Sequence, residues 1–211
     1  MTEHQIREAI VRWSRSLFER RFTVGSSGNI SVKLDDGYIF TPTNSCLGFL
    51  EPARLSRLDA SGKHVSGDPP TKELALHFAF YDARPEACAV VHLHSTYATA
   101  LSCLADTDPD DAMAPITPYM VMRVGRVPII EYVRPGSPDI APLIAAHAPD
   151  HPAVLLANHG PVVAAKSLEA AVYTIEELEE TAKLLVVTRG MNVRHLDADQ
   201  IADLEQTFRM R

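Results

Sequence analysis

The sequence predicts an α/β protein whose mainly antiparallel sheet is covered by helices. Two hairpin patterns near the start of the chain indicate antiparallel strands. Helical patterns precede, separate and follow the strand patterns, so helices are expected to pack on the sheet. We expect one domain spanning residues 1–211, because the chain contains no internal repeat or linker and its 46% hydrophobic content allows a sizeable core.

A helix is expected at the start of the chain. Thr2 and Gln5 have the spacing of a capping box, and an apolar stripe follows at helical spacing. The stripe consists of Ile6, Ile10, Trp13 and Leu17. Charged residues occur throughout this segment, so it is not expected to be a signal peptide.

The hairpins follow this helix. Residues 30–34 and 38–41 have strand patterns joined around residues 36–37, an Asp-Gly pair that is typical of a tight turn. Residues 53–68 have a second pattern of two strands joined by a turn, which lies near residues 61–62. Two neighbouring antiparallel strand pairs are therefore expected.

The middle of the chain alternates helix and strand. A helical pattern begins at Thr71 and is ended by Pro85. Residues 87–94 are apolar up to their histidines, which predicts a buried central strand. Ser95 then has the position of a helix cap for the short helical pattern that follows.

In the second half, residues 127–132 and 153–160 are expected to be strands separated by a helix over residues 137–147. Residues 161–165 form a further strand pattern after a tight turn at residues 159–160.

The longest helix is expected from Ser167, its cap, to Gly190, where it stops. Its glutamates are interpreted as a solvated face without catalytic role, with Glu179 and Lys183 spaced for an ion pair. These glutamates are Glu176, Glu177, Glu179 and Glu180.

Charge and cysteine content exclude several classes of protein. The net charge is −7 and no lysine or arginine block is present, so nucleic acid is not an expected partner. No apolar run approaches the roughly 20 residues of a membrane span, so no membrane partner is expected. The cysteines are odd in number and lack C-x-x-C spacing, which indicates a reducing cytoplasm and neither disulfides nor a cysteine–zinc site. They are Cys46, Cys88 and Cys103.

Histidines stand at the polar ends of two apolar strand patterns. His92 and His94 are two residues apart, so in a strand they point to one face. His159 ends a second strand pattern, and three histidines are the donor set of a catalytic zinc site. The alternative is that His92 and His94 are core-edge histidines bonded to backbone or water and that His159 only stabilises its turn. The remaining histidines are interpreted as surface or helix residues; they are His4, His64, His77, His147, His151 and His195.

Glu73 is the carboxylate of interest near these histidines. It lies in the first turn of the helix expected from Thr71, where the helix dipole favours a negative charge. That electrostatic role would explain Glu73 without any chemistry. If Glu73 instead faces the histidines, it can bind the metal or transfer a proton.

Three short segments have the composition of anion sites. Small residues in 26–31 let backbone N–H groups approach an oxygen atom closely. Residues 41–45 offer hydroxyl and amide groups, and residues 70–73 add a helix N-terminus with a lysine beside it. Each segment alone is an ordinary turn or cap, but together with a metal they favour a phosphorylated, oxygen-rich substrate.

These motifs together resemble a known family. "SSGNIS", "TPT", "KE" before a helix, "HLHS", and "NHG" before a long helix occur in the order and spacing of the class II aldolase/adducin family. The resemblance extends from about Ser26 to Gly190. The stretches "TPYMVMRVG", "LLANHGPVVAAKSLEAA", "EELEETAKLL" and "PTKE" are most similar to the 3-oxo-tetronate 4-phosphate decarboxylases of that family.

The resemblance implies a single three-layer αβα domain, a divalent metal such as zinc, and a homotetramer with active sites at subunit interfaces. Glu73 would be the acid/base and a further metal ligand. Tyr119 stands where relatives place a proton-donating tyrosine, which would reach a neighbouring subunit's site; its alternative is a plain sheet or interface aromatic. The implied metal ligands are His92, His94 and His159. The implied phosphate-binding residues are Gly28, Asn29, Thr43, Asn44, Thr71 and Lys72.

Two positions depart from the family pattern. Members often have glycine where this chain has Asn44, and the sugar-phosphate aldolases often have two serines in place of Thr71 and Lys72. Both changes affect the phosphate pocket, and the lysine favours a substrate that also carries a carboxylate.

The activity that the resemblance implies is metal-dependent decarboxylation of 3-oxo-tetronate 4-phosphate to dihydroxyacetone phosphate and CO2, through an enediolate that the metal stabilises. The protein would then be a carbon–carbon lyase of sugar-acid catabolism. One alternative is retro-aldol cleavage of a ketose 1-phosphate such as L-fuculose 1-phosphate; dehydration or epimerisation of a sugar phosphate would use the same site. Another alternative is an adducin-like binding domain, against which the intact set of three histidines and Glu73 argues.

Overall fold

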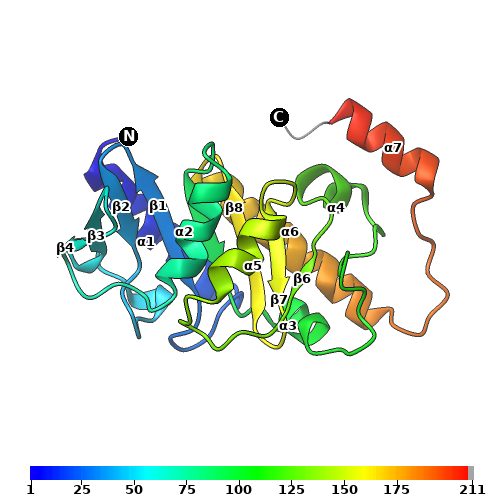
Figure 1. The fold of residues 1–211 in the computed structure, drawn as a ribbon. Helices are drawn as coiled ribbons and strands as arrows, with labels where there is room; N and C mark the ends of the chain where they lie inside the picture. Colours follow the sequence, from blue (N-terminus) through cyan, green and yellow to red (C-terminus); the bar gives the residue numbers. More distant parts are fainter. Residues whose placement is uncertain (209–211) are drawn as a thin grey trace.

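The computed structural model describes residues 1–208, in which one eight-stranded sheet has helices on both faces (Figure 1). The strand order is β4-β3-β2-β1-β5-β8-β7-β6, and every neighbouring pair is antiparallel except β6 with β7. The strands are β1 (Asn29–Leu34), β2 (Gly37–Phe40), β3 (Ser56–Asp59), β4 (His64–Ser66), β5 (Ala89–His92), β6 (Ile129–Ile130), β7 (Ala153–Leu156) and β8 (Gly160–Ala165). The predicted, mainly antiparallel sheet is confirmed.

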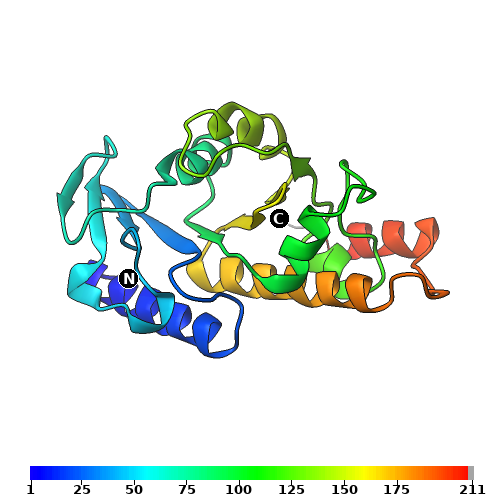
Figure 2. The same cartoon turned by 90° about the horizontal axis from the view of Figure 1, so that it is seen from below.

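Seven α-helices occur within the described residues, and the last of them contacts the fourth helix instead of the sheet. They are α1 (Glu3–Glu19), α2 (Leu74–Ala83), α3 (Thr96–Ser102), α4 (Pro118–Arg123), α5 (Ile140–His147), α6 (Leu168–Val187) and α7 (Ala198–Thr207), with short 3-10 turns η1 (Leu47–Phe49) and η2 (Pro52–Arg54). One hydrophobic core lies between the sheet and α1, α3, α4 and α6. A second core lies between the opposite face and α2 with α5, which gives three αβα layers (Figure 2). None of the helices in residues 1–208 combines the length and apolarity needed to cross a membrane.

Local sequence signals determine most of these boundaries. Thr2 and Gln5 form the predicted capping box at the start of α1, and the helix buries Ile10 and Leu17 completely. At the start of α6, the Ser167 hydroxyl accepts a hydrogen bond from the Ala170 backbone N–H. Both predicted hairpins are present as β1–β2 and β3–β4.

The start of α2 differs from the prediction. The helix begins at Leu74 instead of Thr71. The Thr71 N–H donates to the Thr41 carbonyl, and Pro70 forms an antiparallel bridge with Pro42. This pairing keeps the chain extended before Glu73, so the helix begins three residues later than predicted. Helices α4 and α7 were not predicted.

The turn between β7 and β8 lies directly against the end of β5. An added Cβ at Gly160 would stand 2.3 Å from the Leu93 carbonyl oxygen, a distance that excludes every residue with a side chain. Asn158, two residues earlier, has φ of +55°, a left-handed conformation that asparagine tolerates better than most residues. Glycine at position 160 therefore allows His159 to approach the histidines after β5.

A buried hydrogen-bonded chain joins α2 to β1. The Asn29 amide N–H donates to Glu73 Oε2 at 2.8 Å, so Asn29 Oδ1 accepts from His77 Nε2–H. His77 Nδ1 then accepts from the Ser31 hydroxyl at 2.7 Å, and Ser31 accepts from the Tyr81 hydroxyl at 2.7 Å. All donors thus point toward Glu73. His77 lies in a helix, as expected, but its side chain is fully buried.

Burial of His77 in this hydrogen-bonded network makes the stability of the protein depend on pH. Desolvation lowers the pKa of His77 to about 3, and the neighbouring His92 lowers it further whereas Glu73 opposes the shift. Since this pKa is depressed in the folded protein, the unfolded state binds the proton first as the pH falls below about 6.5.

We expect the free energy of unfolding to fall by about 2 kcal/mol between pH 7 and pH 5 through His77 alone. A His77→Gln variant lacks this titration, so its unfolding free energy should fall by that much less over the same interval. Urea denaturation of both proteins at the two pH values measures the difference. An equal fall in both would show that His77 does not remain neutral in the folded protein.

Candidate metal centre and active site

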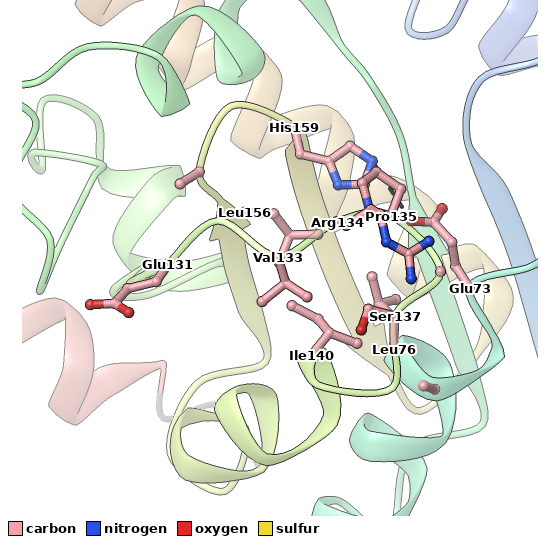
Figure 3. A pocket seen from close by; sticks show the side chains of 13 residues that line it. Glu73, Leu76, Glu131, Val133, Arg134, Pro135, Ser137, Ile140, Leu156 and His159 are labelled. Carbon is pink, nitrogen blue, oxygen red and sulfur yellow. Dashed lines mark ion pairs between the residues drawn. The ribbon is translucent and has the colours of Figure 1, made fainter.

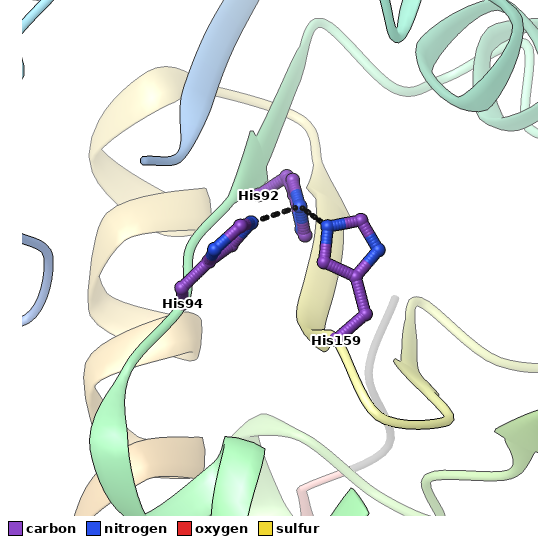
Figure 4. Close-up of side chains that lie close together, drawn as sticks. All are labelled: His92, His94 and His159. Carbon is purple, nitrogen blue, oxygen red and sulfur yellow. Dashed lines mark hydrogen bonds between the residues drawn. The ribbon is translucent and has the colours of Figure 1, made fainter. Parts of the chain in front are cut away.

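Three histidines converge where β5 ends. His92 is the last residue of β5, His94 lies two residues beyond it, and His159 lies in the turn that leads into β8 (Figure 4). The Nε2 atoms of His94 and His92 are 3.1 Å apart, and those of His92 and His159 are 3.3 Å apart. The structure therefore brings together all three histidines that the sequence indicated.

The arrangement fits a tetrahedral metal ion. Nitrogen ligands about 2.0–2.1 Å from such an ion stand about 3.3 Å from one another, close to the separations found here. His92 Nδ1–H donates a hydrogen bond to the Pro161 carbonyl at 2.9 Å. This leaves the lone pair of His92 Nε2 directed at the other two histidines. The donor set is thus oriented to hold a cation.

The three imidazoles are held in the neutral form that binds metals. Burial lowers the pKa of His92 well below its ordinary value, and the adjacent His159 and His94 lower it further. Burial also lowers the pKa of His94 and of His159, in both cases partly opposed by the Glu73 carboxylate. Protons therefore do not compete strongly with a metal ion at neutral pH.

Glu73 faces the histidine cluster. Its Oε2 lies 3.6 Å from His92 Nε2 and its Oε1 lies 3.7 Å from His159 Nε2, separations close to those between ligands of one ion. Although Glu73 is the residue before α2, its side chain makes no capping hydrogen bond to that helix. Capping therefore does not account for Glu73.

The three segments expected to be anion sites are linked through the backbone to residues around this cluster. An added Cβ at Gly28 would stand 2.9 Å from the His92 carbonyl oxygen, so the 26–31 segment passes close to β5. The Thr43 N–H donates to the Pro69 carbonyl at 2.9 Å, which joins the 41–45 segment to the residues before Lys72. Lys72 is exposed and forms no ion pair within residues 1–208.

Asn44 occupies a position that suits glycine. Its φ of +55° lies in the left-handed region, which asparagine adopts more readily than other residues with side chains. Asn44 therefore keeps a turn that glycine would also form, and it adds an amide group beside Thr43.

The interpretation of Glu179 as part of a solvated face is wrong. Glu179 is 7% exposed, and its two carboxylate oxygens accept hydrogen bonds from the Tyr97 and Ala98 N–H groups at 2.9 and 2.8 Å. It thereby caps α3, the helix that directly follows the histidines. The predicted cap, Ser95, makes no capping bond, and its buried hydroxyl has no partner in the described part of the chain. Lys183 pairs with Glu180 instead, at 3.7 Å.

Sequence reasoning missed Arg134. This residue lines one cavity together with Glu73 and His159, and Figure 3 shows its side chain beside theirs. The available signal was an Arg-Pro-Gly sequence that begins two residues after the strand pattern of residues 127–132.

Tyr119 lies apart from the cluster in this chain. It is on α4, its side chain is 53% exposed, and the Arg123 guanidinium lies 5.7 Å from the centre of its ring. Its predicted role in a neighbouring subunit's site therefore stays a prediction.

Comparisons with known proteins show which family this chain resembles. Residues 8–186 match the model of the "Class II Aldolase and Adducin N-terminal domain" family. A 3-oxo-tetronate 4-phosphate decarboxylase of Pectobacterium atrosepticum is 50% identical over 204 residues, which cover 96% of this chain and 94% of the relative. An L-fuculose phosphate aldolase of Methanocaldococcus jannaschii is 33% identical over 181 residues, covering 86% of this chain and 96% of the relative.

A similar fold is known from crystal structures. That of YgbL from Escherichia coli superimposes with a TM-score of 0.93 at 48% identity, covering 96% of this chain and 98% of the other. The family model and the curated relatives each extend over most of this chain. The chain belongs to the class II aldolase and adducin family.

Proposed function

We propose that this protein is a metal-dependent carbon–carbon lyase that converts 3-oxo-tetronate 4-phosphate to dihydroxyacetone phosphate and CO2. The observation that carries the proposal is the convergence of three neutral histidines and Glu73 next to the anion-binding segments. The choice of substrate is supported by decarboxylase relatives that are half identical over nearly the whole chain.

We propose zinc as the divalent metal of this site. Its ligands would be His92, His94 and His159, with Glu73 as a fourth ligand when no substrate is bound. When bound, such an ion supplies Lewis-acid stabilisation of negative charge on substrate oxygens.

Binding of the phosphate positions the substrate for cleavage. We assign this role to six residues from the three segments described above, since their backbone N–H, hydroxyl, amide and ammonium groups can donate to phosphate oxygens. Binding energy at this end of the substrate can orient the carbon–carbon bond that breaks. The six residues are Gly28, Asn29, Thr43, Asn44, Thr71 and Lys72.

Glu73 would complete the reaction by donating a proton. When CO2 leaves, the electron pair of the broken bond stays on the substrate, and a proton must be added to the carbon that lost the carboxylate. Glu73 Oε2 accepts from the Asn29 amide, so the transferable proton would sit on Oε1, the oxygen that faces His159. Tyr119 of a neighbouring subunit is the second candidate for a proton donor.

The second candidate function is retro-aldol cleavage of a ketose 1-phosphate. The similarity to L-fuculose phosphate aldolases supports it, and the same metal ligands and phosphate contacts would serve both reactions. The lower identity of these relatives makes the decarboxylase the better-supported function.

We further propose that residues 1–211 form one domain and that the protein is a cytoplasmic homotetramer with active sites at subunit interfaces. Large aromatic side chains of the kind that subunit interfaces cover are exposed at Tyr119 and Tyr132. The three cysteines are free, which agrees with a reducing compartment.

Metal-loaded protein incubated with 3-oxo-tetronate 4-phosphate should release CO2 and dihydroxyacetone phosphate in equal amounts. A Glu73→Gln variant keeps an acceptor for Asn29 but cannot carry a proton, so its rate should fall by about 10²- to 10⁴-fold. Quantifying both products against a reaction without enzyme measures this.

Each outcome of this assay decides one point. If Glu73→Gln releases CO2 at the rate of the original protein, Glu73 is not the proton donor. If the metal-loaded original protein releases no CO2, the decarboxylase proposal is wrong, and L-fuculose 1-phosphate becomes the next substrate to test.

Removal of one histidine should abolish metal retention and activity together. A His94→Ala variant loses one of three neutral donors, and we expect metal content and CO2 release both to fall to background. His195→Ala is the matched control, because His195 is exposed and outside the cluster. Elemental analysis after dialysis, with circular dichroism to verify folding, gives the answer. Full activity in a metal-free His94→Ala protein would refute the proposed metal centre.

A further inference from the structure

A rigid turn holds Arg134 at the edge of the histidine cluster. The Ser137 N–H donates to the Arg134 carbonyl at 2.9 Å, and Pro135 and Gly136 are the central residues of this turn. Gly136 has φ of +79°, which with the preceding proline has the features of a type II turn. An added Cβ at Gly136 would stand 3.3 Å from the Lys72 carbonyl oxygen, so the turn packs against the residue before Glu73.

The guanidinium of Arg134 is available to a ligand. It lines the same cavity as Glu73 and His159, and Figure 3 shows it reaching toward both. In the region spanning residues 1–208, Arg134 forms neither an ion pair nor a side-chain hydrogen bond, although Glu73 and Glu131 also line this cavity. Its donors therefore remain unused beside a site built for an anionic substrate.

We propose that Arg134 binds the carboxylate that leaves as CO2, and so selects a 3-oxo acid phosphate over a ketose 1-phosphate. This inference rests on the proposed decarboxylase function. A planar guanidinium pairs with a carboxylate through two parallel hydrogen bonds. The 3-oxo acid phosphate carries a carboxylate at one end and a phosphate at the other, whereas a ketose 1-phosphate carries only the phosphate. The segments assigned to the phosphate already supply donors for it, so the donors of Arg134 remain for the carboxylate.

The chemistry of the leaving group predicts which kinetic constant Arg134 controls. The carboxylate carries a full negative charge in the bound substrate and loses it as neutral CO2 forms. Arg134 therefore stabilises the bound substrate at least as much as the transition state. Loss of this contact should raise KM without lowering kcat, since the interaction weakens as the bond breaks.

Kinetics of Arg134→Gln and Arg134→Lys test the proposal. We expect KM for 3-oxo-tetronate 4-phosphate to rise about 10- to 100-fold in Arg134→Gln, the usual effect of losing a hydrogen-bonded charge pair, and kcat to stay within about threefold. Arg134→Lys should recover part of the affinity, because lysine keeps the charge but not the paired geometry. Arg12→Gln, at an exposed position on α1, is the matched control and should leave both constants unchanged.

Inhibition by dihydroxyacetone phosphate separates the two ends of the substrate. This product keeps the phosphate and lacks the carboxylate, so its inhibition constant should stay the same in Arg134→Gln. An unchanged KM, or an equal loss of affinity for substrate and product, would overturn the proposal, and the second result would place Arg134 at the phosphate. If only the Arg134 proposal is contradicted, the decarboxylase proposal still stands. If the original protein releases no CO2, both the decarboxylase proposal and the Arg134 proposal are wrong.

Discussion

The candidate site depends on close backbone contacts along both sides of strand β5. Gly160 lies against the Leu93 carbonyl, and Gly28 lies against the His92 carbonyl, at distances that leave no room for a Cβ atom. The first contact brings His159 to His92 and His94, and the second brings the 26–31 segment beside them. Because both contacts are made by the main chain of paired strands, the histidine geometry follows from the sheet itself.

The catalytic candidate Glu73 is supported from the interior of the protein. Its Oε2 oxygen accepts from Asn29, whose own orientation is fixed through His77, Ser31 and Tyr81 in the layer between α2 and the sheet. A carboxylate on the segment before a helix would otherwise have several rotamers available. The hydrogen bond from Asn29 favours one of them, and the donors of the buried network behind Asn29 all point the same way.

Sequence reasoning succeeded where the relevant signals are local. Alternating strand patterns, the capping box of α1 and the histidines at the strand ends all lie within short windows. It failed for Glu179 because helical spacing cannot reveal that α3 lies against that residue, 81 positions away. The start of α2 was misplaced because pairing of Thr71 with Thr41 competes with the helix. Arg134 was missed since its importance arises only from the cavity that it shares with His159.

The cap that Glu179 provides for α3 also affects the charge balance around the histidines. The first N–H groups of a helix carry a partial positive charge, and those of α3 follow His94 by only a few residues. A cation held by three neutral imidazoles would be repelled by that helix end. The Glu179 carboxylate accepts hydrogen bonds from the Tyr97 and Ala98 N–H groups of that helix end and so offsets its partial charge. The electrostatic surroundings of the proposed metal site therefore include a carboxylate that is not among its proposed ligands.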